Sequence, residues 1–238
     1  YAPDYVEKML ARAEETNANS IVPDVEFGYG NTQKLPNMFV QHHLSADLVI
    51  NDGKKAFAMT LPWQLHGWQM IRTSLAKKYY TVQQASYSKF NSDEYITRLL
   101  YLKSNKVALC SACYQYRVDS NSITRKPSLK MMDYLVTNEK LLWLAEYEHL
   151  DKEIILNIYN DYYVTCRDMK KNRIPQLDEK DQAVAYKRLN DSLLKFKKNF
   201  NWKYLKGASV RTKIKFGLFL MSIRCSFVGG GTFFLLCK

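Results

Sequence analysis

Glycine and proline are scarce in this sequence, which has 9 Gly and 6 Pro among 238 residues. With 47% hydrophobic and 13% aromatic residues, the chain falls outside the disordered, collagen-like and low-complexity classes. It is long enough to bury a core of its own, either as one large domain or as a domain with an appendage. We therefore expect most of the chain to fold.

Several catalytic signatures are also missing. The sequence has no Gly-rich phosphate loop, no His-Glu-x-x-His, no Gly-x-Ser-x-Gly and no set of ligands at zinc spacing, which excludes the enzyme classes built on those motifs. Its four histidines, His42, His43, His66 and His149, form no spaced set, so loop or surface positions are favoured over metal ligation. The chain begins at Tyr1 without a signal-like leader, and we expect it to be a piece of a longer protein.

Cysteine usage favours a reducing compartment. Five cysteines at irregular spacing argue against a disulfide framework, and the cytoplasm is the expected location. Cys110 and Cys113 form a lone Cys-x-x-Cys pair inside an apolar run, where buried strand residues are favoured over zinc ligands.

Positive charge is concentrated at the end of the chain. Ten basic residues and no acidic residue follow Asp191, and they supply most of the formal net charge of +12. From residue 207 onward they are interleaved with apolar residues, while Arg224 and the glycines 229–231 interrupt what would approach a membrane-spanning length. A segment that lies in an anionic membrane interface is favoured. The alternative is a helix docked on the protein's own core.

Hydrophobic periodicity predicts an N-terminal α/β part followed by helices. Pro23 lies inside a predicted strand and requires either a sheet edge or a bulge. The predicted elements are a helix from about residue 5 to Asn17, a strand at 20–27, a loop region with one short helix at 28–52, a helix near 64–77 whose buried face carries Leu65, Trp68, Ile71 and Leu75, a helix that begins at Asn91 or Ser92, a strand at 106–118, and helices at about 128–150, 152–171 and 179–205.

Two groups of polar residues lie at the ends of predicted elements, one at the start of a helix and one after a strand. Asp93 and Glu94 open the helix that starts near residue 91, where acids suit the helix dipole. The strand at 106–118 ends in Tyr114-Gln-Tyr-Arg117 and opens into the polar stretch 119–124. An open α/β sheet places its ligands where a strand ends in a loop.

Four ordered motifs carry a resemblance to a known family: PDYVEKMLARAEETNA, TLPWQLHGWQMIRTSL, SDEYITRLLYL and YQYRVDSNSIT. They resemble the second half of bacterial family 2 glycosyltransferases, which are inverting sugar transferases with a GT-A fold. The resemblance covers residues 1–127 and implies a partial GT-A fold, the acceptor-side half of a nucleotide-diphospho-sugar transferase sheet. Residues 128–206 would then form an α-helical extension, and residues 207–238 a basic amphipathic membrane-associating tail.

The resemblance implies that Asp93 is the catalytic base, with Glu94 in reserve. A carboxylate at this position would take the proton of an acceptor hydroxyl as its oxygen attacks the anomeric carbon, and it would face a hollow that holds the sugar. Ser92 stands where the family has Glu. The alternative role for Asp93 is an acid that only complements the dipole of an ordinary helix.

Trp68, Tyr116, Arg117 and Asp119 would bind acceptor or donor. Trp68 aligns with a tryptophan beside the substrate cleft, although a large aromatic on a helix face is more often a core residue. Arg117 could pair with diphosphate oxygens or form a salt bridge that fixes the strand end. Asp119 stands where many relatives have His, and it could ligate a cation but not neutralise a diphosphate.

The implied partners are a nucleotide-sugar donor, a glycan or lipid-linked acceptor, and a divalent Mg or Mn ion. No Asp-x-Asp pair occurs in the sequence, so we expect the cation ligands and the nucleotide-binding half to be missing and the chain alone to be inactive. The expected location is the cytoplasmic face of the cell membrane, bound peripherally. The alternatives are a non-catalytic binding module and a membrane-associated basic helical protein. Nucleic acid is disfavoured as a partner because the charges lie beside a long apolar run.

Overall fold

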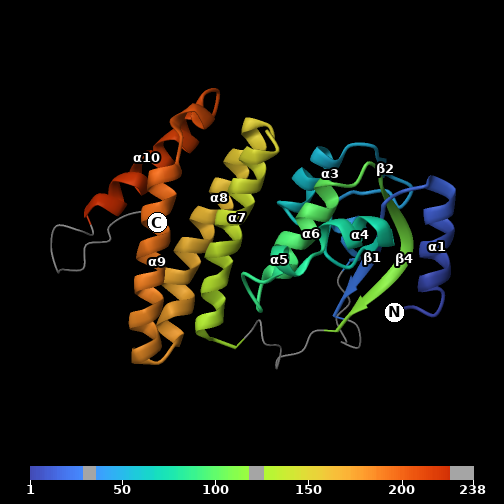
Figure 1. The fold of residues 1–238 in the computed structure, drawn as a ribbon, viewed down its shortest axis with the longest axis horizontal. Helices are drawn as coiled ribbons and strands as arrows, with labels where there is room; N and C mark the ends of the chain where they lie inside the picture. Colours follow the sequence, from blue (N-terminus) through green and yellow to red (C-terminus); the bar gives the residue numbers. More distant parts are fainter. Residues whose placement is uncertain (29–35, 118–125, 226–238) are drawn as a thin grey trace. The chain divides into compact units, whose positions relative to one another are not determined.

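The structure is a computed structural model that describes residues 1–28, 36–117 and 126–225. The chain divides into two compact units, Tyr1–Lys126 and Pro127–Lys238. Every strand of the described residues belongs to the first unit, and the described part of the second is helical (Figure 1). The described residues are 62% helical and contain one four-stranded mixed sheet, so the prediction of a mixed α/β chain is confirmed.

The sheet of the first unit has the strand order β2-β4-β1-β3. Its two long strands, β1 (Ser20–Phe27) and β4 (Val107–Tyr116), are parallel and lie side by side. The short strands β2 (Val49–Ile50) and β3 (Met70–Ile71) pair antiparallel with β4 and β1 respectively. Both long strands confirm the sequence prediction, whereas neither short strand was predicted.

Pro23 produces a bulge in the middle of the parallel pair. It lies opposite Cys110, but the next residue of β1, Asp24, lies opposite Cys113. Two extra residues of β4 are therefore accommodated at this point, as expected where a proline has no N–H to donate to the ladder. Of the two options that the sequence left open, the bulge is the one observed, because β1 lies inside the sheet rather than at its edge.

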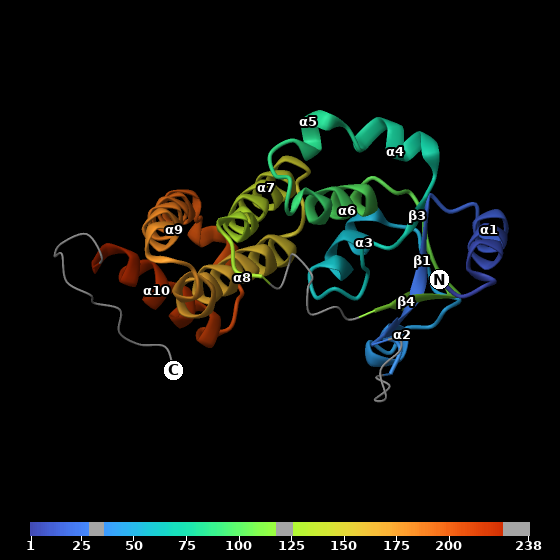
Figure 2. The same ribbon diagram turned by 90° about the horizontal axis from the view of Figure 1, so that it is seen from below.

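Helices cover both faces of this sheet (Figure 2). Alternate residues of a strand point to opposite faces, so Ile21 and Ala108 pack with Met9 of α1, while Val22 and Val107 belong to the core on the side of α3 and α6. The helices of the first unit are α1 (Tyr5–Thr16), α2 (Met38–Gln41), α3 (Gly53–Thr60), α4 (Thr73–Tyr79), α5 (Val82–Ala85) and α6 (Ser92–Leu102). Helices α1 and α6 were predicted close to their observed bounds.

The helix predicted near residues 64–77 is wrong over residues 64–72, and only its last part coincides with a helix, α4. The backbone at Trp63 is left-handed, with a φ of 54°, and the chain from there runs through turns into β3 before α4 begins at Thr73. Leu65 is buried in the core beside α3, but Ile71 pairs with Ser20 of β1. Sheet pairing has overridden the helical spacing of these apolar residues, so Trp68 does not lie on a helix face.

Four long helices form the described part of the second unit. They are α7 (Asp133–Tyr147), α8 (Lys152–Asp168), α9 (Glu179–Asn199) and α10 (Val210–Cys225). Short helical segments lie before α7 (η1, Leu129–Met132), between α8 and α9 (η2, Met169–Arg173, and η3, Ile174–Gln176) and between α9 and α10 (η4, Trp202–Leu205). The three helical stretches predicted between residues 128 and 205 are confirmed. Their core is aromatic: Tyr159, Tyr162, Phe196 and Phe216 are at most 1% exposed. Within the described part of the chain, no helix is long and apolar enough to span a membrane.

Candidate functional site

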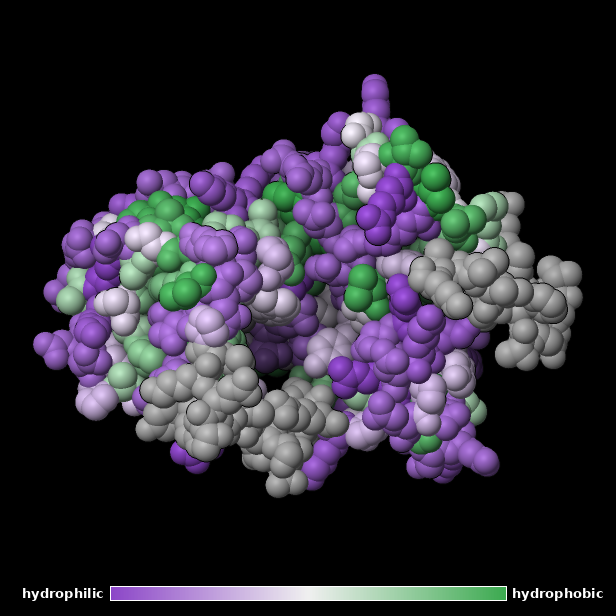
Figure 3. All heavy atoms as spheres, turned by 180° about the vertical axis from the view of Figure 1, so that it is seen from behind, coloured by the Kyte–Doolittle hydropathy of each residue, from purple (hydrophilic) through white to green (hydrophobic). Residues whose placement is uncertain are grey.

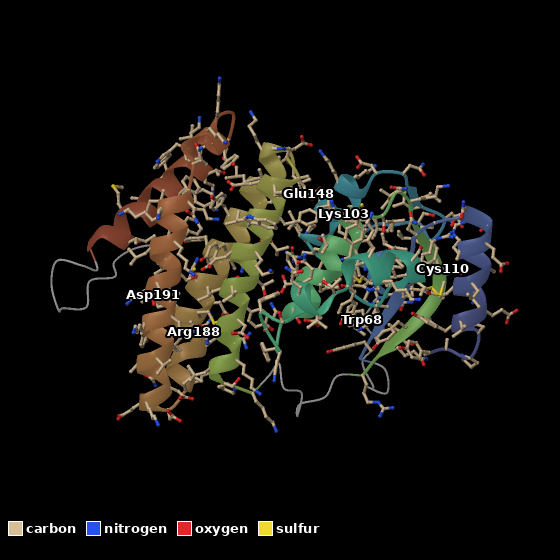
Figure 4. All side chains as sticks on the ribbon, viewed as in Figure 1. Trp68, Lys103, Cys110, Glu148, Arg188 and Asp191 are labelled. Carbon is tan, nitrogen blue, oxygen red and sulfur yellow. The ribbon has the colours of Figure 1, made fainter. Side chains whose placement is uncertain are left out.

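Four aromatic side chains gather where the two long parallel strands end. Phe27 ends β1 and Tyr116 ends β4, and their ring centroids are 5.9 Å apart. Trp68 stacks on Tyr114 with the ring centroids 4.8 Å apart and 14° between the planes, and its ring lies 5.1 Å from that of Tyr116. All four side chains are half-buried, and Figure 4 shows Trp68 beside the strand ends. We call these four residues the aromatic cluster.

His66 fixes the segment that carries Trp68. Its buried ring accepts a hydrogen bond at Nδ1 from the backbone N–H of Trp68, over 3.2 Å. Nε2 must then carry the proton, and it donates to the carbonyl of Pro23 over 2.9 Å. Burial lowers the pKa of His66 to about 4, which keeps the ring neutral near pH 7. His66 thus lies in a loop, one of the two predicted settings, but its side chain is buried rather than at the surface.

The same segment, residues 66–68, packs along α6. The O–H of Tyr101 donates to a carbonyl of this segment over 2.7 Å. A Cβ placed on Gly67 would lie 3.0 Å from the Oγ1 of Thr97. Asp93 precedes Thr97 by four residues, and side chains at this spacing share one face of a helix. Asp93 is therefore on the face of α6 that the segment 66–68 contacts one turn further along.

The two predicted acids have different surroundings. Glu94 accepts a hydrogen bond from the Nδ2 of Asn91 over 3.0 Å and forms an ion pair with Arg98, also at 3.0 Å. Arg98 is buried, and its guanidinium carbon lies 4.6 Å from the ring centroid of Trp63. The Asp93 side chain is exposed on the first turn of α6. The structure thus places Glu94 in a network with its own helix. The expectation that Asp93 faces a hollow is wrong, because its side chain is exposed to solvent.

The other predicted site residues fall into three situations. Trp68 and Tyr116 are brought together in the aromatic cluster, and Arg117 follows as an exposed residue just beyond the end of β4. Asp119 lies outside the described residues.

Sequence reasoning missed two residues that shape this region, His66 and Arg98. The signal for Arg98 was present, because its spacing of four from Glu94 is that of a helical ion pair. His66 carries no such signal, since both of its hydrogen-bond partners are backbone groups.

The cysteine pair is structural. Cys110 is buried in β4 and its Sγ lies 3.5 Å from the carbonyl oxygen of Lys8, while Cys113 is half-buried. Burial raises the pKa of both thiols, so they are protonated near neutral pH. Their prediction as strand residues is confirmed.

No set of metal ligands is found in the described ranges 1–28, 36–117 and 126–225, where no three His, Cys, Asp or Glu side chains form a group that could hold an ion. The divalent cation that the resemblance implies thus has no fitting ligand set in these ranges.

Helix α10 has one buried side and one exposed apolar side. Phe216, Leu220 and Ile223 are buried in the helical unit, whereas Ile214 and Met221 are 56% and 57% exposed. In Figure 3 apolar side chains follow the line of α10 on the surface. Docking on the protein's own core, one of the two predicted alternatives, therefore accounts for one side of this helix and leaves an apolar side uncovered. Residues 226–238 of the predicted tail lie outside the described residues.

Comparisons with protein-family models, with curated proteins and with solved structures gave no match to this chain. The resemblance to family 2 glycosyltransferases therefore stands on the four sequence motifs alone.

Proposed function

We propose that residues 1–126 form the acceptor side of an inverting glycosyltransferase, which moves a sugar from a nucleotide-sugar donor to a glycan or lipid-linked acceptor. The observation that carries the proposal is the first half of α6. An exposed carboxylate, Asp93, lies on the helix face that also carries Thr97, and Thr97 lies next to the segment 66–68 that bears Trp68. The neighbouring Glu94 is held by Asn91 and Arg98. This arrangement supports Asp93 as the base and gives Glu94 a positioning role.

Asp93 would act on the acceptor hydroxyl. As the acceptor oxygen forms its bond to the anomeric carbon, its proton passes to the Asp93 carboxylate. The bond from the anomeric carbon to the departing nucleotide diphosphate breaks on the opposite face, and the diphosphate leaves with the electron pair. Attack on one face and departure from the other inverts the configuration of the transferred sugar.

The aromatic cluster would position the acceptor. Half-buried rings at the carboxyl ends of parallel strands offer a flat apolar surface where open α/β sheets bind their ligands. Trp68 and Tyr116 suit the apolar faces of sugar rings, and Arg117 beside them could pair with phosphate oxygens of the donor. The hydrogen bonds of His66 to Pro23 and Trp68 would keep this surface in place.

The second unit supports a further proposal, contact with the cytoplasmic face of an anionic membrane through residues 207–238. Ile214, Leu218 and Met221 recur at helical spacing along the exposed side of α10. Lys and Arg are the only charged residues after Asp191. Apolar area together with positive charge is the combination that binds anionic lipid surfaces. Such contact would bring the first unit to a lipid-linked acceptor.

The transfer proposal is tested with Asp93→Asn in the protein produced from its complete coding sequence. We expect turnover to fall about 100-fold or more, because the base is lost, while donor binding persists. Glu94→Gln is the matched control, and we expect it to lower the melting temperature and to reduce turnover less. Unchanged turnover in Asp93→Asn would contradict the assignment. A wild type that binds glycans but transfers no sugar from any nucleotide sugar would favour a non-catalytic binding module.

A further inference from the structure

The second unit contains an apolar groove between the end of α9, the turn η4 and α10. Its volume is about 390 Å³, at the lower end of the range of small-molecule sites, roughly 300 to 1,000 Å³. One of its lining residues, Lys197, is charged, and five lack a charge: Phe200, Trp202, Gly217, Leu220 and Met221. A ligand of this groove must therefore be largely hydrocarbon.

The floor of the groove is held by packed aromatic rings. Phe200 stacks on Phe216 with the ring centroids 5.2 Å apart and on Phe196 at 5.8 Å. Trp202 packs edge-on against Phe200 with the ring centroids 5.5 Å apart, and its side chain is 57% exposed. It therefore forms one side of the groove and is accessible from solvent. Rings packed in this way form a well-defined floor of the groove, while Trp202 and Met221 at its edges are exposed.

Gly217 keeps the groove open. A Cβ placed on this residue would have no other atom within 4 Å, so no neighbouring group requires a glycine at this position. Ile214, Gly217, Leu218 and Met221 share one face of α10, because they are spaced three or four residues apart. The groove thus continues into the exposed apolar side of α10, and Met221 belongs to both.

Positive charge lies beside this apolar surface. Lys197 lines the groove, and Lys213 is exposed four residues before Gly217, on the same side of α10. Lys215 lies elsewhere, with its Nζ 4.5 Å from the ring centroid of Tyr163 on α8. The sequence has no acidic residue after Asp191. A ligand that fits must therefore combine a hydrocarbon chain with a negative charge.

We propose that this groove holds one acyl chain of an anionic phospholipid, with the phosphate of the same lipid against Lys197 and Lys213. This inference rests on the membrane contact proposed above, and it names the lipid class and the place of its chain. An exposed tryptophan beside a chain-sized groove suits the region between lipid headgroups and acyl chains. Met221, with its flexible thioether, can adapt to the bound chain.

The test uses vesicles of equal parts phosphatidylcholine and phosphatidylglycerol whose acyl chains carry bromine, which quenches tryptophan fluorescence on contact. We expect strong quenching in the wild type that is lost in Trp202→Phe. Gly217→Phe fills the groove with a ring, and it should abolish the quenching of Trp202 and weaken vesicle binding about tenfold. Val184→Phe adds the same ring at an exposed position near the start of α9, outside the groove and outside residues 207–238, and it should leave both unchanged.

A second measurement needs no variant that could misfold. Dihexanoyl-phosphatidylglycerol is water-soluble and carries two short chains, whereas glycerophosphoglycerol is the same headgroup without chains. We expect the first to shift the Trp202 emission saturably and the second to have no effect. Equal responses to the two compounds would overturn the chain site, because the headgroup alone would then explain binding.

The outcomes distinguish the lipid groove from the membrane contact on which it rests. If the wild type binds the vesicles but Trp202 is not quenched, or if Gly217→Phe is quenched like the wild type, the groove assignment is overturned and membrane contact stands. If the wild type does not bind anionic vesicles at low salt, both fall, while sugar transfer is still judged through Asp93. Displacement of the soluble lipid by single-stranded nucleic acid, or a dimer that Gly217→Phe dissociates, would also overturn the lipid site.

Discussion

The two units use their helical glycines in opposite ways. In the first unit, a Cβ on Gly53 at the start of α3 would lie 2.3 Å from the carbonyl oxygen of Leu102, the last residue of α6. In the second unit, a Cβ on Gly217 in the middle of α10 would contact nothing within 4 Å. The first glycine allows two backbones to touch, and the second leaves space at the surface. The difference indicates a unit that holds its groups in fixed positions and a unit that can accept a ligand between its side chains.

The two units also differ in how their charges are balanced. The acids at the start of α6 lie in a setting that separates their roles, since Glu94 is paired with Arg98 and Asp93 is exposed. The end of the second unit carries lysines and arginines with no acid among them. Acids with distinct surroundings, as in the first unit, suit a chemical step. Unbalanced positive charge beside an apolar surface, as in the second unit, suits attachment to an anionic membrane.

The largest effect on stability is expected from Gly53→Ala. The added methyl group would overlap the backbone of Leu102 and Ser104, which cannot move aside without separating α3 from α6. We expect a loss of more than about 3 kcal/mol in the free energy of unfolding. Urea unfolding measures the loss, and hydrogen exchange should place it in residues 1–126. Exchange that rises equally in both units would contradict the separation drawn between them.

Acid should weaken the first unit through His66. Its pKa is about 4 in the folded protein and about 6.5 in an unfolded chain, so the unfolded state binds more protons between these values. Stability is therefore complete above about pH 6.5 and falls as the pH is lowered toward 4, by about 3 kcal/mol from this residue. Urea unfolding at a series of pH values measures the slope. His66→Gln has no titrating ring, and the same slope in this variant would refute the assignment.

The smallest effect is expected from Gly217→Ala, the counterpart of Gly53→Ala. A methyl group at Gly217 meets no atom, and alanine loses less conformational entropy than glycine on forming a helix. We expect a gain of about 0.5 to 1 kcal/mol in the free energy of unfolding, again measured with urea. A loss of stability would show that the space beside Gly217 is not open in solution.

Long elements with one strong signal could be predicted from the sequence. The strands at 20–27 and 106–118 are rich in strand-forming residues, and α6 has acids at its start and apolar residues at helical spacing. Proline at position 23 correctly limited the options to an edge or a bulge. The helices of the second unit followed from periodicity and from the breaks near residues 150 and 175.

Elements that depend on distant partners could not be predicted. Strands β2 and β3 have two residues each, too few to show an alternating pattern, and they exist because β4 and β1 are there to pair with them. The apolar residues between 65 and 75 fit a helix by spacing, but the left-handed backbone at Trp63 and the pairing of Ile71 direct the chain elsewhere.

The candidate site also depends on contacts between residues distant in the sequence, which the sequence alone does not show. Trp68 and Tyr116 were singled out separately, and the structure brings their rings within 5.1 Å. The resemblance ranked Asp93 above Glu94, but the sequence could not show how their surroundings differ, because that difference comes from Arg98 and from the burial of Arg98 beside Trp63. For His66 the sequence predicted only a loop or surface position, because both of its hydrogen-bond partners are backbone groups, which residue types do not reveal.

The most direct test of the account is fluorine NMR of the protein labelled with 5-fluorotryptophan. The four tryptophans give one signal each, Trp63 and Trp68 from the first unit and Trp143 and Trp202 from the second, assigned with Trp→Phe variants. A panel of oligosaccharides should include acceptors that shift the Trp68 signal saturably and leave Trp202 unchanged, while dihexanoyl-phosphatidylglycerol should do the reverse. Oligosaccharides that shift only Trp143 or Trp202, or no signal at all, would contradict a sugar site at the aromatic cluster.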